Sequence, residues 1–252
     1  MKKHIYKIIA VVAGVAAVAC AAVGGYKYYQ EKHAGDDYEE VRETVKKEVE
    51  PVAEEKAPVA IPIDFAALQE QNPEVYAWIQ IQDTNIDYPI LQREGDNGYY
   101  LNHTIDGEQK TEGSIFTEDY NSKDFEDPNT VIYGHDMKNG SMFQNLLYYQ
   151  DKDFFDKHKD VIIYTPDTIR HYKVFAAYLY DDRHLIQSFD FNIKSVYQAY
   201  LDSIFAIRDM SAQIDTTQQV SADDKIITLS TCYGSQSDKR FLVQAVLVSI
   251  EK

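Results

Sequence analysis

Short runs of β-forming residues, separated by turn signals, constrain the fold of this chain more than any other feature. Branched and aromatic side chains dominate these runs, as is typical of strands. The runs occupy residues 81–92, 114–117, 130–133, 161–165, 170–180, 225–232 and 241–250. Asp, Asn, Gly and Pro gather between them, as at 96–98, 127–129 and 138–140. Seven or eight short strands with regular turns predict a mainly β domain, either a sandwich or a closed barrel.

Helical patterns precede and interrupt the strand-like runs. Asp64 can cap a short helix, and Asn72-Pro73 has the form of a second helix start before the apolar run 75–79. Residues 141–157 and 192–208 also carry apolar side chains near helical spacing. We therefore expect helices before the β domain and two helical insertions within it.

Composition excludes several classes of protein. The net charge of −16, from 25 Lys and Arg against 41 Asp and Glu, argues against nucleic-acid binding, which needs a basic face. Two cysteines exclude a disulfide-stapled scaffold and a cysteine-rich zinc module. The sequence contains neither a glycine-rich phosphate loop nor His and Cys at metal-ligand spacing. We therefore expect no metal and no cofactor.

The N-terminus has the pattern of a membrane anchor. Residues 8–25 are 18 consecutive uncharged, mostly apolar positions, which just reaches the length of a transmembrane helix. Lysines precede this run and tyrosines follow it, so residues 1–29 are expected to form a cytoplasmic tip and a single transmembrane signal-anchor. A cleaved signal peptide and a lipoprotein acylated on Cys20 are the alternatives. Each interpretation places most of the chain outside the cell membrane.

Residues 30–63 are rich in charge and poor in large apolar groups. Val41, Val45 and Val49 are spaced by four, which permits one helical stripe, and prolines interrupt the chain beyond them. We expect an acidic stalk that is partly helical or disordered, followed by a folded domain at 64–252.

Cys232 has the setting of a reactive thiol. It ends the strand-like run 226–232, in which alternate side chains share a face. Ile227 and Leu229 therefore face the core, whereas Ser230 and Cys232 face the other way. A cysteine on a polar face at a strand end is displayed rather than packed.

Arg240 begins the final strand after a seven-residue loop. A hairpin across this loop pairs Cys232 with Arg240, Ser230 with Leu242 and Thr228 with Gln244. Cross-strand partners have β-carbons about 5 Å apart, so the guanidinium would lie beside the thiol. There it could favour the thiolate or hold an oxyanion. By itself, Arg240 would be interpreted as a solvated charge at a strand start.

A thiol nucleophile also needs a base or an ion-pair partner, usually histidine. His135 has the best setting, because the strand 130–133 ends in Gly134-His135 and a turn follows. His103 and His184 lie in predicted loops and remain alternatives.

These motifs resemble those of the sortases, the cysteine transpeptidases of Gram-positive cell surfaces. The resemblance rests on Thr-Leu-Ser-Thr-Cys at 228–232, on Arg240 eight residues later and on Tyr-Gly-His at 133–135. It covers about residues 64–252 and is strongest to class B members. Further support comes from residues 72–79, 84–90 and 96–101, and from the helical segment 192–208 before the cysteine-bearing strand.

The resemblance implies a closed eight-stranded β-barrel and assigns a role to each site residue. Cys232 would be the nucleophile, His135 the acid and base, and Arg240 the stabiliser of the oxyanion or substrate. The residues implied to bind the substrate peptide are Leu101, Ser230, Thr231, Leu185 and Ile186.

The implied activity is cleavage of a C-terminal sorting signal after Thr through a thioacyl-enzyme. The secreted protein bearing that signal would then be joined to an amine of a peptidoglycan precursor. A pilin-polymerising sortase, whose acceptor is a pilin lysine, is one alternative. A non-enzymatic anchored surface binding module is another, and it predicts an unreactive Cys232. A cysteine hydrolase is a lesser variant.

Overall fold

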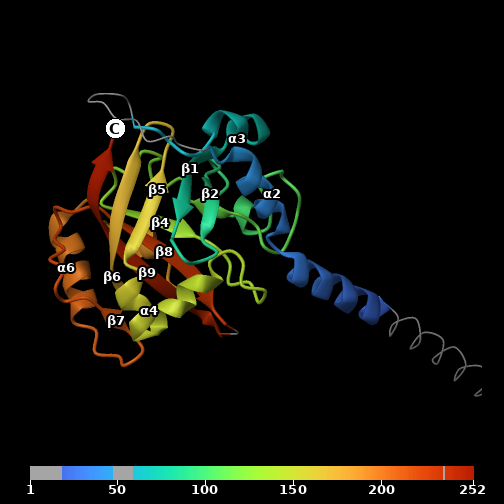
Figure 1. Cartoon of the computed structure of the whole chain (residues 1–252). Coiled ribbons are helices and arrows are strands. Elements are labelled where there is room, and N and C mark those ends of the chain that lie inside the picture. Colours follow the sequence, from blue (N-terminus) through green and yellow to red (C-terminus); the bar gives the residue numbers. More distant parts are fainter. Residues whose placement is uncertain (1–18, 48–58, 235) are drawn as a thin grey trace, which may run out of the picture.

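A β-barrel forms the centre of the molecule in the computed structural model, which describes residues 19–47, 59–234 and 236–252 (Figure 1). Within these residues the strands are β1 (Val75–Gln80), β2 (Asp87–Leu91), β3 (Ile115–Thr117), β4 (Asn129–Tyr133), β5 (Asp160–Tyr164), β6 (Ile169–Asp181), β7 (Gln213–Ile214), β8 (Ile226–Tyr233) and β9 (Gln236–Glu251).

The strands close on themselves. They form one sheet in the order β5-β1-β2-β3-β4-β8-β9-β6, and β5 also pairs with β6. The short β7 pairs with β6 at Ala176 and Ala177. The predicted closed eight-stranded barrel is therefore confirmed. Strands β4 and β8 run parallel, so their carboxyl ends meet at the same rim of the barrel. That rim carries both of the sequence motifs that end in a candidate catalytic residue.

The expected helix after Asn72-Pro73 is wrong, because these residues lead into β1. All residues of β1 except the last are buried, and the strand pairs with β2 on one side and β5 on the other. A strand buried on both faces is a continuous apolar run, which periodicity alone cannot distinguish from a buried helix. The branched and aromatic residues Val75, Tyr76, Trp78 and Ile79 favour the strand.

The helical insertions cover the barrel. Helix α6 (Lys194–Phe205) buries Tyr197, Tyr200, Leu201 and Ile204 in an apolar layer with residues of β4, β6, β8 and β9. Figure 1 shows α6 beside β6. Each such side chain stabilises the fold by about 1.5–3 kcal/mol when fully buried. The predicted helix at 192–208 is thus confirmed over Lys194–Phe205, and it adds a second apolar layer outside the barrel.

The other predicted helices are shorter than expected. Helix α3 (Phe65–Gln71) is capped by Asp64, whose Oδ1 accepts from the Ala67 amide at 3.2 Å, as predicted. The segment 141–157 divides at Asp151 into a 3₁₀ helix η2 (Gln144–Gln150) and α4 (Lys152–Lys157). The remaining short elements are the 3₁₀ helix η1 (Tyr99–Leu101) and helix α5 (Leu185–Ser188).

Part of the segment expected to be a stalk packs on the barrel. Helix α2 (Asp36–Val45) buries Tyr38, Val41 and Val45, and the Tyr38 hydroxyl donates to the Gly113 carbonyl at 2.8 Å. Tyr38 adds a large buried side chain to the apolar stripe of Val41 and Val45, which favours docking of α2 on the barrel. Residues 48–58 of the expected stalk lie outside the described residues.

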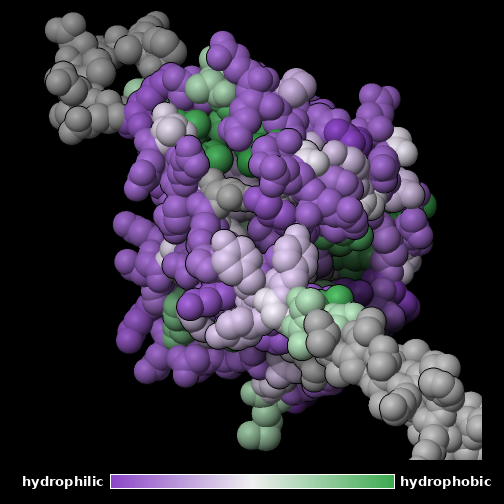
Figure 2. Space-filling model, turned by 90° about the vertical axis from the view of Figure 1, so that its right-hand side faces the viewer, coloured by the Kyte–Doolittle hydropathy of each residue, from purple (hydrophilic) through white to green (hydrophobic). Residues whose placement is uncertain are grey.

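Residues 19–33 form a helix that projects away from the barrel (Figure 1). The predicted membrane-spanning segment 8–25 lies mostly outside the described residues. Among the helices that are described, none combines the length and the apolar character needed to cross a bilayer. The face of the barrel on this side is largely hydrophilic, in keeping with the high net negative charge (Figure 2).

Candidate active site

Cys232 lies near the end of β8, where the strand reaches the rim of the barrel. Strands β8 and β9 form an antiparallel ladder in which Cys232 pairs with Arg240, and a β-bulge follows directly after Cys232. The predicted pairs of Ser230 with Leu242 and of Thr228 with Gln244 are both present. The Cys232 side chain is half-buried. The hairpin register therefore makes Cys232 and Arg240 cross-strand partners, as predicted. The expected seven-residue loop before Arg240 is wrong, because β8 continues to Tyr233 and β9 already begins at Gln236.

The polar face of β8 is buried along most of its length. Thr228 is fully buried and Ser230 is 7% exposed, because the α6 layer covers this face. The Thr228 hydroxyl donates to Asn129 Oδ1 and accepts from Gln244 Nε2, both at 2.8 Å. These bonds satisfy the buried hydroxyl, so the face remains polar at little cost. Exposure along this face increases toward the rim, where Cys232 is half-buried.

His135 is brought to the same rim by β4. In the β4–β8 ladder Tyr133 pairs with Ser230, and the Gly134 amide extends the ladder by donating to the Ser230 carbonyl at 3.1 Å. A Cβ on Gly134 would lie 2.4 Å from Ile115 Cδ1 and 2.7 Å from Phe143 Cγ. A side chain at this position would therefore force Ile115 and Phe143 to shift.

The His135 imidazole has a defined orientation. Its Nε2–H donates to the Leu101 carbonyl at 2.6 Å, which leaves Nδ1 without the proton in the neutral ring. The alternative histidines are engaged elsewhere. His103 stacks on Tyr99 with ring centroids 3.9 Å apart, and His184 Nε2 lies 2.7 Å from Glu118 Oε2.

Asp136 joins the two loops that follow β4 and β8. Its Oδ2 accepts from the Gly234 amide at 3.1 Å, two residues after Cys232. Burial raises the pKa of the Asp136 carboxyl, and the hydrogen bond from Gly234 opposes that effect in part. Sequence reasoning did not identify Asp136, although its position directly after His135 could have drawn attention to it.

A groove of about 210 Å³ opens beside Arg240. Four of the predicted residues line it: Leu101, Ser230, Leu185 and Arg240. Its other lining residues are Asn97, Phe116, Glu118, Val131, Tyr133, Tyr180, Asp182, Arg183, His184 and Leu242. Apolar walls with a few polar groups suit an extended peptide.

Two predicted substrate-binding residues lie elsewhere. The Thr231 side chain is 2% exposed and shares the core-facing side of β8 with Leu229, so only its backbone is near the groove. Ile186 lines a different hollow, together with Tyr120 and Asn129. Within the part of the chain that the structure describes, no three His, Cys, Asp or Glu side chains gather as metal ligands would.

Sequence reasoning missed the polar floor of the groove. The Tyr133 hydroxyl donates to Glu118 Oε2 at 3.0 Å, and the same carboxylate contacts His184. Burial, with the nearby Glu118, raises the pKa of Tyr133, which therefore keeps its proton as a donor. Tyr133 stands in the Tyr-Gly-His motif, which was the available signal. No sequence spacing connects Glu118 to His184.

Comparisons with known proteins agree with this geometry. A family model described as the sortase domain matches residues 79–248. Sortase B of Listeria monocytogenes is 38% identical over 185 residues, which cover 72% of this chain and 73% of that protein.

Solved structures give the same result. Sortase B from Bacillus anthracis superposes with a TM-score of 0.71 at 31% identity, over 89% of this chain and 99% of that chain. The Staphylococcus aureus sortase B–substrate complex has a TM-score of 0.65 at 30% identity, over 74% and 85% of the two chains. The chain therefore belongs to the class B sortases and is a cysteine transpeptidase of the sortase type.

Proposed function

We propose that this sortase cleaves a C-terminal sorting signal after Thr and joins the new carboxyl end to an amine of a peptidoglycan precursor. One observation carries the proposal. Cys232 and Arg240 are cross-strand partners at the rim where His135 leaves the neighbouring β4. These pairings bring a nucleophile, a proton carrier and a cation to one rim of the barrel, and the groove opens beside the cation.

In the first step, the Cys232 sulfur attacks the carbonyl carbon of the Thr in the sorting signal. The peptide C–N bond breaks as the protonated His135 imidazole gives its proton to the leaving amine. The product is a thioester between Cys232 and the Thr carbonyl. The Arg240 guanidinium stabilises the negative oxygen of the tetrahedral intermediate.

In the second step, the acceptor amine attacks the thioester carbonyl. Neutral His135 removes a proton from this amine, the C–S bond breaks, and Cys232 leaves as the thiolate. Arg240 again faces the oxyanion. The enzyme returns to its starting state, with the proton on His135.

The groove beside Arg240 supplies the binding site for the sorting signal in this proposal. Leu101 and Leu185 contribute apolar wall, and Ser230 contributes a hydroxyl on the face of β8 that it shares with Cys232. Leu101 has a second contact, because its carbonyl accepts from His135. A peptide seated against Leu101 would therefore lie next to the imidazole that moves its proton.

The proposed location is the outer face of the cell membrane, with residues 8–25 as a single-pass anchor. The support is the apolar run with preceding lysines. Substrates held in the same bilayer would meet the enzyme at a raised effective concentration.

The test is capture of the acyl-enzyme. The full chain is incubated with peptides that carry candidate sorting motifs, and intact-protein mass spectrometry detects the thioacyl adduct. Cys232→Ala should abolish the adduct, whereas Cys20→Ala should preserve it. Turnover by Cys232→Ala would overturn the proposal.

The acceptor is tested in the same assay by comparing a peptidoglycan-precursor peptide with a pilin-type lysine peptide. Ligation to the precursor amine supports anchoring to the cell wall. Ligation to the lysine peptide alone would contradict it and favour a pilin polymerase.

A further inference from the structure

The residues after His135 form a small hairpin, residues 135–143, called here the His135 hairpin. The His135 carbonyl accepts from the Phe143 amide at 2.9 Å, and Asp136 and Met142 form an antiparallel bridge. A turn closes the other end, where the Gly140 amide donates to the Met137 carbonyl at 2.9 Å. His135 is thus at the base of the hairpin and Asn139 is at its tip.

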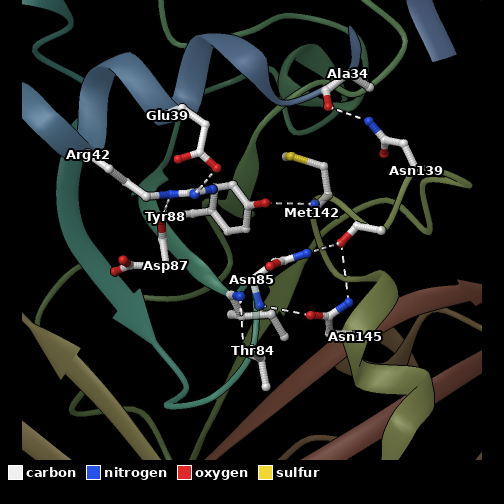
Figure 3. A network of polar contacts seen from close by, with 12 residues as sticks. Ala34, Glu39, Arg42, Thr84, Asn85, Asp87, Tyr88, Asn139, Met142 and Asn145 are labelled. Carbon is white, nitrogen blue, oxygen red and sulfur yellow. Dashed lines mark hydrogen bonds and ion pairs between the residues drawn. The ribbon is translucent and has the colours of Figure 1, made fainter. Parts of the chain in front are cut away.

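The tip of the His135 hairpin contacts the end of the N-terminal helix. The Asn139 Nδ2 donates to the Ala34 carbonyl at 2.6 Å (Figure 3) and to the Lys32 carbonyl at 3.5 Å. The last carbonyls of a helix have no partner within it and need one from elsewhere. Asn139 therefore acts as a cap, supplied from the active-site side, for the helix of residues 19–33.

Backbone packing supports the same contact. Gly35 follows the helix with φ of +86° and turns the chain into α2. A Cβ on Gly35 would lie 2.8 Å from the Cβ of Ser141, closer than real contacts allow. The turn into α2 is therefore pressed against the His135 hairpin at a distance that only glycine permits.

Asn139 also holds the turn of the hairpin itself. Its Oδ1 accepts from the Ser141 amide at 3.1 Å and from the Ser141 hydroxyl at 2.7 Å. One amide group thus connects two structures: its oxygen fixes the hairpin turn and its nitrogen fixes that turn to the N-terminal helix.

The opposite side of the hairpin is held by the barrel. The Tyr88 hydroxyl accepts from the Met142 amide at 2.9 Å, and Asn85 Nδ2 donates to the Gly140 carbonyl at 3.0 Å (Figure 3). The N-terminal segment is also fixed, because Arg42 Nε donates to the Asp87 carbonyl at 2.8 Å. The hairpin is therefore clamped between β2 and a docked N-terminal segment.

We propose that Asn139 is a positioning residue of the transpeptidation, which holds the His135 hairpin in place by capping the end of the N-terminal helix. The inference rests on the role of His135 in the proposed function. Misplacing a reacting group by about 1 Å can cost about 10²-fold in rate. The segment that leads from the barrel toward the N-terminus is, on this proposal, part of the catalytic unit.

Two substitutions in the full chain test the proposal. Asn139→Ala removes both functions of the side chain. Asn139→Asp keeps the oxygen that accepts from Ser141 but has no N–H for the Ala34 carbonyl. We expect both variants to lose about tenfold in kcat, with KM for a sorting-signal peptide within about twofold of wild type, because the groove residues are unchanged.

Controls separate this positioning role from general destabilisation. Asp151 caps α4 by accepting from the Phe154 amide at 2.9 Å, so Asp151→Ala removes a comparable bond outside the His135 hairpin. That variant should keep wild-type kcat. If Asn139→Asp has wild-type kcat, the inference fails, because Asn139 then serves only its own turn. If His135→Ala is active, the proposed function fails instead.

Discussion

The two arms of the active site are built in different ways. Cys232 and Arg240 belong to a regular antiparallel ladder, in which the position of each residue follows from the register of β8 and β9. His135 belongs to an irregular hairpin, which is held by the Ala34 carbonyl before α2, by the Tyr88 hydroxyl of β2 and by the Gly234 amide after β8. The ladder arm is local in sequence, whereas the hairpin arm depends on contacts between residues 54, 98 and 105 positions apart.

This difference predicts how each arm responds to substitution. In the ladder arm the backbone fixes the geometry, so a side chain can be removed with little movement of its neighbours. The effect should then be chemical and confined to the missing group. In the hairpin arm, a substitution that shifts the backbone should displace His135 as well, and stability and rate should fall together.

The largest effect is expected for Arg240 in the ladder arm. Arg240→Ala should reduce kcat by about 10²–10³, because one donor to the tetrahedral oxyanion is lost. Unfolding should be almost unchanged, since the ladder remains. Steady-state kinetics with a sorting-signal peptide and thermal unfolding measure the two quantities.

Arg240→Lys keeps the positive charge but loses the planar guanidinium, so its kcat should lie between those of wild type and Arg240→Ala. Arg208 is the matched control, because its Nη1 donates to the Phe205 and Ile207 carbonyls at the end of α6. Arg208→Ala should retain wild-type kcat. A kcat within tenfold of wild type for Arg240→Ala would refute the assigned role.

A smaller, mixed effect is expected for Gly134 in the hairpin arm. Gly134→Ala places a Cβ 2.4 Å from Ile115 Cδ1, and both Ile115 and Phe143 are fully buried. Overpacking of this kind costs about 1–3 kcal/mol of unfolding free energy. Because His135 is the next residue, we expect kcat to fall about tenfold in the same variant. Chemical denaturation and kinetics give the two numbers.

A second substitution can relieve this clash. Ile115→Val removes Cδ1, so the double variant Gly134→Ala with Ile115→Val should recover part of both stability and kcat. Gly98→Ala is the control, since its Cβ would meet only Asp96 Oδ1 at 3.9 Å. If the losses of unfolding free energy in the two single variants simply add in the double variant, the contact with Ile115 is not what excludes a side chain at Gly134.

The contrast between the arms also explains what could be predicted from sequence. Strand alternation and the short separation of Cys232 from Arg240 are local features, and they were enough to pair the two residues, although most of the loop assumed between them is strand. The end of a strand at Gly134 placed His135 at a rim. The number of strands left a sandwich and a closed barrel open, and the resemblance to the sortases favoured the barrel. The buried strand β1 was mistaken for a helix because it is apolar on both faces.

The contacts that were missed join distant segments through polar side chains. Nothing in the spacing of Asn139 and Ala34, or of Asp136 and Gly234, indicates that they meet. Thr231 was misplaced for a simpler reason, because a strand residue next to a catalytic one faces the opposite side. Hairpin register is thus readable from sequence, whereas the support of an irregular loop appears only in the folded molecule.

The smallest expected effect concerns Asp136, whose side chain joins the two arms. Asp136→Asn keeps an oxygen that can accept from the Gly234 amide, so kcat should stay within about threefold of wild type. Stability should change with pH, because burial raises the native pKa of this carboxyl. As pH rises from the ordinary aspartate pKa toward the raised native pKa, Asp136 loses its proton first in the unfolded chain, which favours unfolding.

The pH dependence has a definite sign. Asp136→Asn should gain stability relative to wild type as pH rises from the ordinary aspartate pKa through the raised native value, and the gain should persist at neutral pH. Asp119 gives the opposite control, since hydrogen bonds from the Gly95 amide and Asn97 lower its pKa. Asp119→Asn should therefore lose stability relative to wild type as pH rises from the lowered native pKa to the ordinary aspartate pKa. Thermal unfolding from pH 3 to pH 7 measures both. A relative loss for Asp136→Asn at neutral pH would mean that the charge itself supports the junction, and the two arms would then be joined by electrostatics rather than by one hydrogen bond.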